Sequence, residues 1–171
     1  MFKKVCIIGC GLIGSSIARG IKKNKLETKV VSSNRSNSTN KKVIRLKIAN
    51  EASSDTKKIV KGSDLIIIAS PLSSYKNIIL KIKSSLKNGA ILTDVGSVKK
   101  NVISVIEKNI PKNVSWISSH PIAGTEESGP ESGFSELFKD RWCILTPSQQ
   151  SKEQDVKLLE TFWKNLSTRL E

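Results

Sequence analysis

Short runs of apolar residues alternate with stretches of helical spacing over the first 120 residues. The run at 65–69, Leu-Ile-Ile-Ile-Ala, has no polar break, which is typical of a strand buried on both faces of a parallel sheet. This alternation predicts an α/β fold, a doubly wound Rossmann-type sheet that is mostly parallel, with helices on both faces. The predicted strands cover 5–8, 28–33, 65–69, 90–94 and 115–119, and the predicted helices cover 15–24, 39–48, 56–61, 71–86 and 99–109.

The last fifty residues follow a different pattern. Residues 126–140 are polar with several glycine or proline breakers and predict an ordered loop, and 142–145 predict a final strand. From residue 151 the apolar positions keep helical spacing to the end, at Val156, Leu159, Trp163, Leu166 and Leu170. We therefore divide the chain into a Rossmann-type domain at 1–150 and a helix at 151–171. A helix that ends with uncovered apolar residues predicts a further domain, missing here or supplied by a partner.

The chain has a formal net charge of +14, and its lysines are spread along the predicted helices. Nucleic-acid binding by a basic surface is one alternative. Aromatic residues are few, however (3 Trp, 1 Tyr and 4 Phe), and they are not interleaved with the lysines. We expect no nucleic-acid partner and a surface field that favours anionic small molecules.

Targeting signals and metal-binding spacings are not recognisable in the sequence. No apolar run approaches the roughly 20 residues of a membrane-spanning helix, and the amino terminus does not resemble a signal peptide. Cys6, Cys10 and Cys143 are odd in number and lack the spacing of metal ligands or of a disulfide framework. These features predict reduced thiols, no metal site, no membrane association and a cytoplasmic location.

Three glycines follow the first predicted strand with the spacing Gly9-x-Gly11-x-x-Gly14 and precede a helix. In this context the first glycine permits a tight turn, the second lets the backbone approach a pyrophosphate, and the third lets helix and strand pack closely. The pyrophosphate would lie against the backbone of Leu12 and Ile13, where free N–H groups and the helix dipole favour an anion. The pattern predicts a dinucleotide-binding site.

The residues after the second predicted strand bear on which dinucleotide binds. An acidic residue about 20 positions after the glycines would bind the ribose hydroxyls of NAD. The chain has Ser33, Asn34, Arg35 and Ser36 there, and no carboxylate. Hydroxyls, an amide and a guanidinium suit a 2′-phosphate, so we predict NADP as the preferred cofactor and NAD as the alternative. Alternatively, Arg35 stacks on adenine or faces solvent while Asn34 binds NAD.

Two further groups of residues follow predicted strands, where open α/β sheets bind their ligands. Ser70, Pro71 and Leu72 follow the strand at 65–69 and are predicted to line the dinucleotide cleft, or alternatively to start a helix. His120, the only histidine, follows the strand at 115–119. Since imidazole titrates near neutral pH, His120 is a candidate for proton transfer or hydrogen bonding to a substrate. The alternative is a partly buried histidine in a turn.

Three motifs, in this order along the chain, resemble the prephenate/arogenate dehydrogenase family of tyrosine biosynthesis. They are Gly9-Cys-Gly-Leu-Ile-Gly-Ser-Ser16, Thr93-Asp-Val-Gly-Ser-Val-Lys99 and His120-Pro-Ile-Ala-Gly-Thr-Glu126. Residues 128–129, 137–138 and 142–147 also resemble this family, so the similarity spans essentially the whole chain. The β-hydroxyacid dehydrogenases share the glycine motif but not the run that begins at His120.

The resemblance implies oxidative decarboxylation of prephenate or arogenate, with hydride transfer to NADP or NAD. It implies that His120 hydrogen-bonds the ring hydroxyl of the substrate, that Ser97 lies near this hydroxyl and the nicotinamide, and that Glu126 lies near the mouth of the site. The alternatives are a helix-capping Ser97 and a solvated Glu126. Lys99 is expected to be a solvated helix residue.

Members of this family continue into an all-helical domain that forms a homodimer and completes the substrate site. The resemblance therefore implies that 1–150 is the NAD(P)-binding domain and that 151–171 leads toward a helical domain absent from this chain. We expect the chain alone to bind cofactor but to be inactive. A non-catalytic dinucleotide-binding module or subunit is the alternative function.

Overall fold

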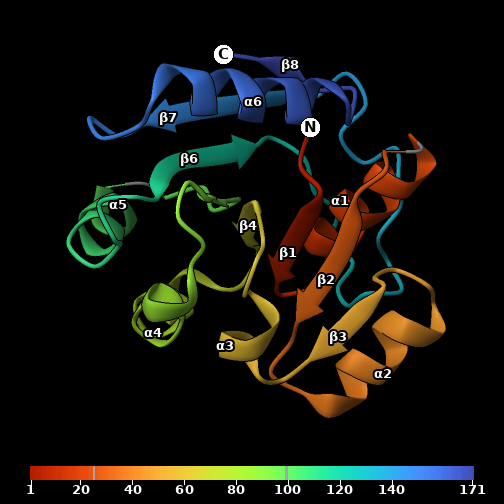
Figure 1. Ribbon diagram of the computed structural model, residues 1–171. Coiled ribbons are helices and arrows are strands. Elements are labelled where there is room, and N and C mark those ends of the chain that lie inside the picture. The colour runs from red at the N-terminus through yellow and green to blue at the C-terminus, as the bar shows by residue number, and fades with distance from the viewer. Residues whose placement is uncertain (25, 99) are drawn as a thin grey trace.

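Both terminal regions of the chain contribute to one sheet (Figure 1). The computed structural model describes residues 1–24, 26–98 and 100–171, and within them eight strands pair in the order β3-β2-β1-β4-β5-β6-β7-β8. The strands are β1 (Lys4–Ile8), β2 (Lys29–Ser33), β3 (Glu51–Ser53), β4 (Leu65–Ile68), β5 (Ile91–Asp94), β6 (Ser115–Pro121), β7 (Trp142–Pro147) and β8 (Arg169–Leu170).

The strands from β3 to β6 pair in parallel, β7 is antiparallel to β6, and β8 is parallel to β7. The chain leaves β1 toward β2 and β3 on one side and then continues with β4 on the other side of β1. This reversal of strand order is the topological switch point at which doubly wound sheets bind ligands. The predicted fold, a mostly parallel doubly wound sheet, is confirmed.

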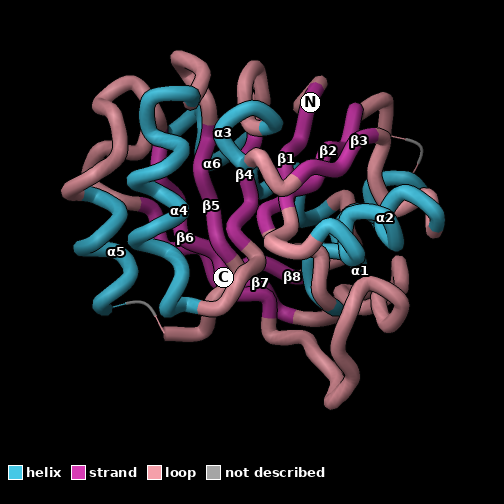
Figure 2. The backbone as a smooth tube through the Cα atoms, turned by 90° about the horizontal axis from the view of Figure 1, so that it is seen from below, coloured by secondary structure: helices cyan, strands magenta, loops and turns pink. Residues whose placement is uncertain are grey.

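Helices cover both faces of the sheet because alternate strand residues point to opposite sides. Val5 and Ile7 of β1 belong to the core beneath α1, α2 and α6, whereas Cys6 and Ile8 belong to the core beneath α3, α4 and α5. Figure 2 shows α4 and α5 side by side on their face. The helices are α1 (Leu12–Lys23), α2 (Asn37–Arg45), α3 (Thr56–Ile59), α4 (Tyr75–Ile82), α5 (Lys100–Glu107) and α6 (Glu153–Lys164), with short 3₁₀ helices η1 (Leu72–Ser74) and η2 (Lys83–Ser85).

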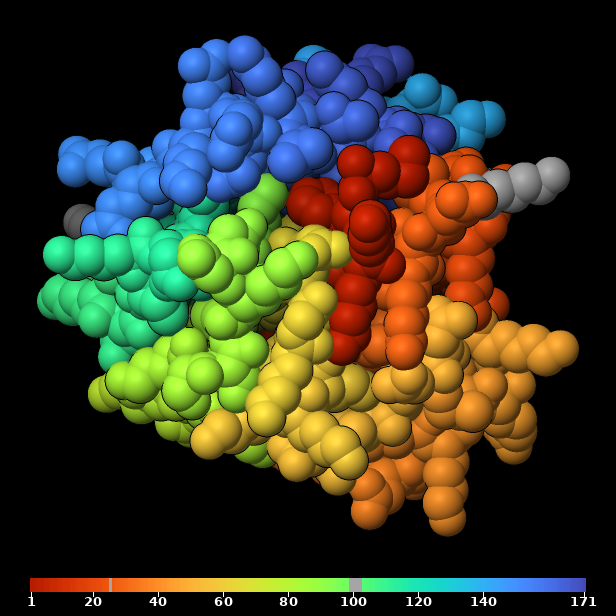
Figure 3. Space-filling model, in the orientation of Figure 1, coloured from red at the N-terminus to blue at the C-terminus, as the bar shows by residue number. Residues whose placement is uncertain are grey.

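The prediction of one helix over 151–171 is wrong for residues 165–171. Helix α6 ends at Lys164, Ser167 takes a left-handed conformation with φ of 65°, and the chain returns to the sheet as β8. Leu166 is buried after the helix has ended, so the apolar spacing continued although the helix did not. Phe162 packs edge-on against Phe2 with ring centroids 6.0 Å apart. The blue carboxyl-terminal segment therefore lies on the red amino-terminal residues, as part of the same domain (Figure 3).

Other differences from the predicted elements are small. The helix predicted over 71–86 is divided into η1, α4 and η2. Strand β3 was not predicted, because a three-residue edge strand has no room for an alternating pattern. None of the helices among the described residues is long and apolar enough to cross a bilayer.

Candidate cofactor and catalytic site

The turn between β1 and α1 accepts only glycine at two of its three glycine positions. Gly9 has φ of +99°, and a Cβ there would lie 2.6 Å from Ser70 Oγ and 2.7 Å from the Ala69 carbonyl oxygen. A Cβ at Gly14 would overlap the carbonyl oxygen of Gly9, so Gly14 allows helix and turn to touch. A Cβ at Gly11 would meet no protein atom within 4 Å. Packing does not require this glycine, and the open space beside it is compatible with the close approach of a ligand.

The first turn of α1 has the properties of an anion-binding site. Its N-cap is Gly11, which has no side chain to cap the helix, and Leu12 and Ile13 follow it. The first turn also holds no acidic side chain. The unsatisfied backbone N–H groups and the positive end of the helix dipole are therefore directed at the space beside Gly11, as a phosphate group requires.

Asn34, predicted to contact the cofactor, has a buried side chain that holds the turn together. Its Oδ1 accepts a hydrogen bond from the Cys10 backbone N–H at 2.7 Å. Its Nδ2 donates to Ser32 Oγ and to Asn40 Oδ1, both at 2.9 Å. Both amide hydrogens are thus used within the protein. A contact between this amide and a cofactor stays a prediction, since the amide has first to give up one of these partners.

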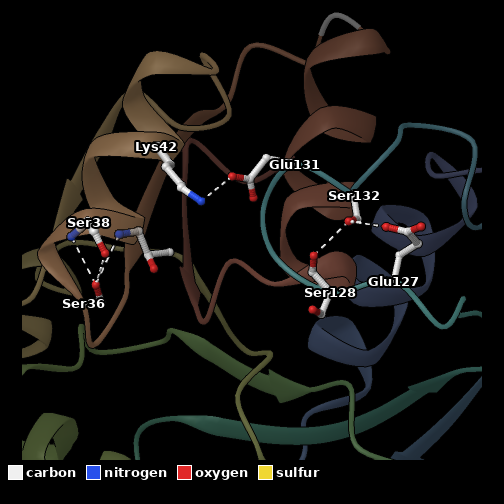
Figure 4. A network of polar contacts seen from close by, with 8 residues as sticks. Ser36, Ser38, Lys42, Glu127, Ser128, Glu131 and Ser132 are labelled. Atoms are coloured by element: carbon white, nitrogen blue, oxygen red, sulfur yellow. Dashed lines mark hydrogen bonds and ion pairs between the residues drawn. The ribbon is translucent and has the colours of Figure 1, made fainter.

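The neighbouring positions divide between structural and exposed roles. Ser33 Oγ lies 2.8 Å from Thr56 Oγ1 and is buried. The Ser36 hydroxyl caps α2 by accepting hydrogen bonds from the backbone N–H groups of Ser38 at 3.1 Å and Thr39 at 3.4 Å (Figure 4). Arg35 between them is exposed at the carboxyl end of β2. Of the four predicted residues, Arg35 has the side chain best placed to meet a ligand in solution.

Residues 122–141, between β6 and β7, form a loop without helix or strand, which includes the stretch 126–140 predicted to be a loop. Lys42 Nζ of α2 lies 2.5 Å from Glu131 Oε1 on this loop (Figure 4). This ion pair lowers the pKa of the Glu131 carboxyl, first through the hydrogen bond from Lys42. Phe134 N–H donates to Ser16 Oγ of α1 at 3.0 Å. The loop thus contacts both α1 and α2 on the side where the predicted cofactor residues lie.

Ser70, Pro71 and Leu72 lie between the glycine turn and the loop after β5. Ser70 Oγ donates to the Ile8 carbonyl at 3.0 Å, beside Gly9. Leu72 Cδ2 packs so closely on Gly96 that a Cβ there would lie 2.6 Å away. The three residues therefore lie along the edge formed by the carboxyl ends of β1, β4 and β5, and their lining of a dinucleotide cleft stays a prediction.

Asp94, at the carboxyl end of β5, was not selected from the sequence and has a fully buried carboxylate. Its Oδ1 accepts hydrogen bonds from Ser118 Oγ at 2.6 Å and Ser119 N at 3.2 Å. Its Oδ2 accepts from Gly96 N at 3.0 Å and Tyr75 Oη at 3.2 Å. The signal that could have revealed it is a carboxylate directly after a buried apolar strand, since such a charge needs several donors.

The end of β6 is held by a second polar group of contacts. Thr93 Oγ1 lies 2.7 Å from Ser119 Oγ, which also accepts a hydrogen bond from Trp163 Nε1 at 3.2 Å. Trp163 comes from α6, so the carboxyl-terminal helix supports the strand position that precedes His120. Burial and the Asp94 charge raise the pKa of the Tyr75 hydroxyl above the usual range, so it stays protonated and can donate its hydrogen bond to Asp94.

The structure brings two of the three predicted catalytic residues to neighbouring strand ends. His120 is half-buried near the end of β6, where it pairs with Ile144 of β7. Ser97 is exposed in the loop after β5, three residues beyond Asp94. Glu126 is exposed farther along, on the 122–141 loop. The prediction for Lys99 falls outside the described residues.

Cys10 lies in the glycine turn, where its Sγ accepts a hydrogen bond from Ser32 Oγ at 3.2 Å, but neither it nor Cys6 is a candidate nucleophile. Burial raises the pKa of Cys6 to about 12 and that of Cys10 to about 11, so both stay protonated and weakly nucleophilic at neutral pH. All three cysteines are buried. Within the described ranges, His, Cys, Asp and Glu side chains form no group of three that could hold a metal ion.

Together, the switch-point topology, the glycine turn and the uncapped α1 define a dinucleotide-binding domain of the doubly wound α/β class. Residues 17–171 match the family described as prephenate dehydrogenase, nucleotide-binding domain, and the chain belongs to this family. The match begins after the glycine turn, so it is independent of the Gly9–Gly14 signature.

Individual relatives agree with the family. The cyclohexadienyl dehydrogenase of Zymomonas mobilis is 33% identical over 170 residues, which are 99% of this chain and 58% of that protein. The prephenate dehydrogenase of Bacillus subtilis is 29% identical over 161 residues, 94% of this chain and 43% of that protein. The Aquifex aeolicus prephenate dehydrogenase, solved with hydroxyphenyl propionate and NAD+, superposes with a TM-score of 0.91 at 26% identity, covering 100% of this chain and 59% of that one. The chain thus spans about 60% or less of each.

Proposed function

We propose that this chain binds NADP+ or NAD+ and is the cofactor-binding part of a prephenate or arogenate dehydrogenase. The observation that carries the proposal is one continuous edge of the sheet. The glycine turn and the uncapped α1 lie beside β1 and β4, and His120 and the Ser97 loop lie at the neighbouring ends of β6 and β5. The residues predicted to bind cofactor and substrate therefore lie at the carboxyl ends of the strands, which supports an oxidoreductase of this class.

The residues present fit a dinucleotide. The backbone N–H groups after Gly11 would hold the pyrophosphate, and Arg35 would meet the adenosine ribose at the end of β2. NADP+ is the preferred cofactor in this proposal, because the end of β2 lacks a carboxylate and offers a guanidinium to a 2′-phosphate. The bound nicotinamide would supply the hydride acceptor.

The chemistry asked of the protein is mainly orientation. The substrate ring becomes aromatic as carbon dioxide leaves, which supplies the driving force, so the residues must place the ring and assist loss of the hydroxyl proton. In this proposal the His120 imidazole accepts a hydrogen bond from the ring hydroxyl and draws its proton away. Ser97 orients the hydroxyl against the nicotinamide, and Glu126 lies at the mouth of the site.

The proposal extends to the whole protein that this domain serves. It would act on prephenate or arogenate in tyrosine biosynthesis, as a homodimer in the cytoplasm. The relatives' names support the reaction class, and their greater length leaves room for the part that would bind the substrate.

The test is a calorimetric titration of this chain with NADP+, NAD+ and duplex DNA at two salt concentrations. We expect saturable one-to-one binding of both dinucleotides, tighter for NADP+, and no specific binding of DNA. A chain that folds but binds neither dinucleotide would contradict the proposal. Binding of DNA that falls steeply with salt would favour a nucleic-acid partner instead.

A further inference from the structure

Asp94 is a fully buried carboxylate to which the proposed function assigns no task. Burying a charge is costly unless it is well hydrogen-bonded, and this carboxylate accepts hydrogen bonds from Tyr75, Gly96, Ser118 and Ser119. The donors come from three places in the chain: the end of β6, the start of α4 and the loop after β5. A carboxylate that joins three segments at a ligand-binding edge suggests a role beyond packing.

The two oxygens of Asp94 face the two segments that carry the predicted catalytic residues. Oδ1 accepts from Ser119 N, one residue before His120, and Oδ2 accepts from Gly96 N, one residue before Ser97. A single carboxylate therefore holds the backbone before His120 at a set distance from the backbone before Ser97.

Gly96 packs closely on this carboxylate and on its neighbours. A Cβ at Gly96 would lie 2.6 Å from Leu72 Cδ2, 3.0 Å from Asp94 Oδ2 and 3.2 Å from Tyr75 Oη. Gly96 is therefore in close contact with the aspartate and its neighbours, and Ser97 is the residue that follows this contact.

We propose that Asp94 is a positioning residue, which sets the Ser97 loop relative to His120 so that this edge binds the nicotinamide end of the cofactor. The inference rests on the proposed function. Asp94 itself is buried and would act through Ser97 and His120 rather than touch the cofactor.

An asparagine at this position tests the idea because it keeps the shape and changes the acceptors. One backbone donor, Ser119 N–H, faces Oδ1, and another, Gly96 N–H, faces Oδ2. The asparagine amide presents one oxygen and one NH₂, so in either orientation a backbone N–H faces the NH₂ group and loses its acceptor. With the oxygen toward Ser119, the Gly96 donor is the one released.

The experiment measures binding of NAD+ and of ADP-ribose, which lacks the nicotinamide, to the chain and to Asp94→Asn. We expect Asp94→Asn to weaken NAD+ roughly tenfold, the size of one unmade hydrogen bond at a buried site, while ADP-ribose changes by less than about twofold. The matched control is Asp64→Asn. Asp64 also accepts two backbone N–H groups, but at the opposite edge of the sheet, and its loss should change neither affinity.

A role in positioning predicts coupling, which a purely structural role does not. Ser97→Ala should weaken NAD+ as well, and in that background Asp94→Asn should have less than about twofold further effect, because its route is already removed. If Asp94→Asn does not fold, Tyr75→Phe removes one donor and keeps the carboxylate, and it should weaken NAD+ by about two- to threefold without affecting ADP-ribose.

The outcomes separate this inference from the function it rests on. Equal weakening of both ligands, additive effects of the two variants, or wild-type NAD+ binding no tighter than ADP-ribose would each overturn the role of Asp94 and leave cofactor binding intact. A folded wild-type chain that binds neither ligand would overturn the proposed function and this inference with it.

Discussion

Two aspartates, Asp64 and Asp94, hold backbone at opposite edges of the sheet with the same chemistry. Asp64 lies at the amino edge, directly before β4, and its Oδ2 accepts from Lys3 N at 2.9 Å and Lys4 N at 3.0 Å. Asp94 lies at the carboxyl edge, as the last residue of β5, and accepts from Gly96 N and Ser119 N. Each joins segments that are distant in sequence.

The difference lies in their surroundings and in what they join. The Asp64 side chain is 22% exposed and forms an ion pair with Lys87 at 2.5 Å, whereas Asp94 is 0% exposed. Asp64 joins the starts of strands, where no ligand is expected, and Asp94 joins two segments with proposed catalytic residues. The comparison teaches that one hydrogen-bonding device can serve stability at one edge and the geometry of a site at the other.

The largest difference between the two edges should be in the loss of stability caused by replacing a glycine with alanine. Gly14→Ala places a Cβ against the Gly9 carbonyl, in contact with backbone that cannot yield, and should lower the free energy of unfolding by about 3 kcal/mol or more. Gly89→Ala, at the amino edge, meets only open space at φ of +76° and should cost about 1 kcal/mol. Urea denaturation measures both, and equal losses would contradict the close packing at the glycine turn.

Reversing a charge near either end of β2 should change the choice between NADP+ and NAD+ only at the carboxyl end. Arg35→Asp at the carboxyl end should raise the dissociation constant for NADP+ roughly tenfold or more and leave NAD+ favoured, since a charge-assisted contact is lost and a repulsion is added. Lys29→Asp at the amino end makes the same change in charge, where Lys29 pairs with Glu51. We expect it to leave the ratio of the two affinities unchanged. Equal ratios for Arg35→Asp and the wild type would remove Arg35 from the phosphate site.

The smallest effect concerns acid stability at Asp64. Burial alone would raise the pKa of this carboxyl, but hydrogen bonds from Lys87 and from the backbone of Lys4 and Lys3 outweigh it, and the pKa is lowered from 3.8. Its ionised form therefore stabilises the fold above pH 3.8, and this stabilisation is lost as the pH falls through the lower, folded pKa.

Asp64→Asn should accordingly be less stable than the wild type by below about 1 kcal/mol at neutral pH, because the carboxylate is partly exposed. The difference should shrink as the solution is acidified below pH 3.8. Thermal unfolding of both proteins across this range gives the measurement, and a difference that grows in acid would reverse the assignment.

Local patterns predicted much of this architecture, and contacts between distant segments account for what they missed. The glycine turn was predictable because strand, turn and helix are consecutive in the sequence, from Lys4 to Lys23, and His120 because a strand precedes it. The inward orientation of Asn34 depends on Asn40 and Cys10, and that of Asp94 on Ser118, 24 residues away. Residue type and position in the sequence do not reveal such partners. The helix at 151–171 failed similarly, because burial of Leu166 after a turn imitates helical spacing.

The position of α6 bears on how this domain can be moved between proteins. A cut at residue 150 would remove Leu159, Phe162 and Trp163 from the core, and with Trp163 the hydrogen bond to Ser119 next to His120. A chimaera joined there would expose apolar surface and loosen the strand that carries the histidine. Grafts that exchange the cofactor domain among these dehydrogenases should therefore be joined beyond Leu170, where β8 closes the sheet.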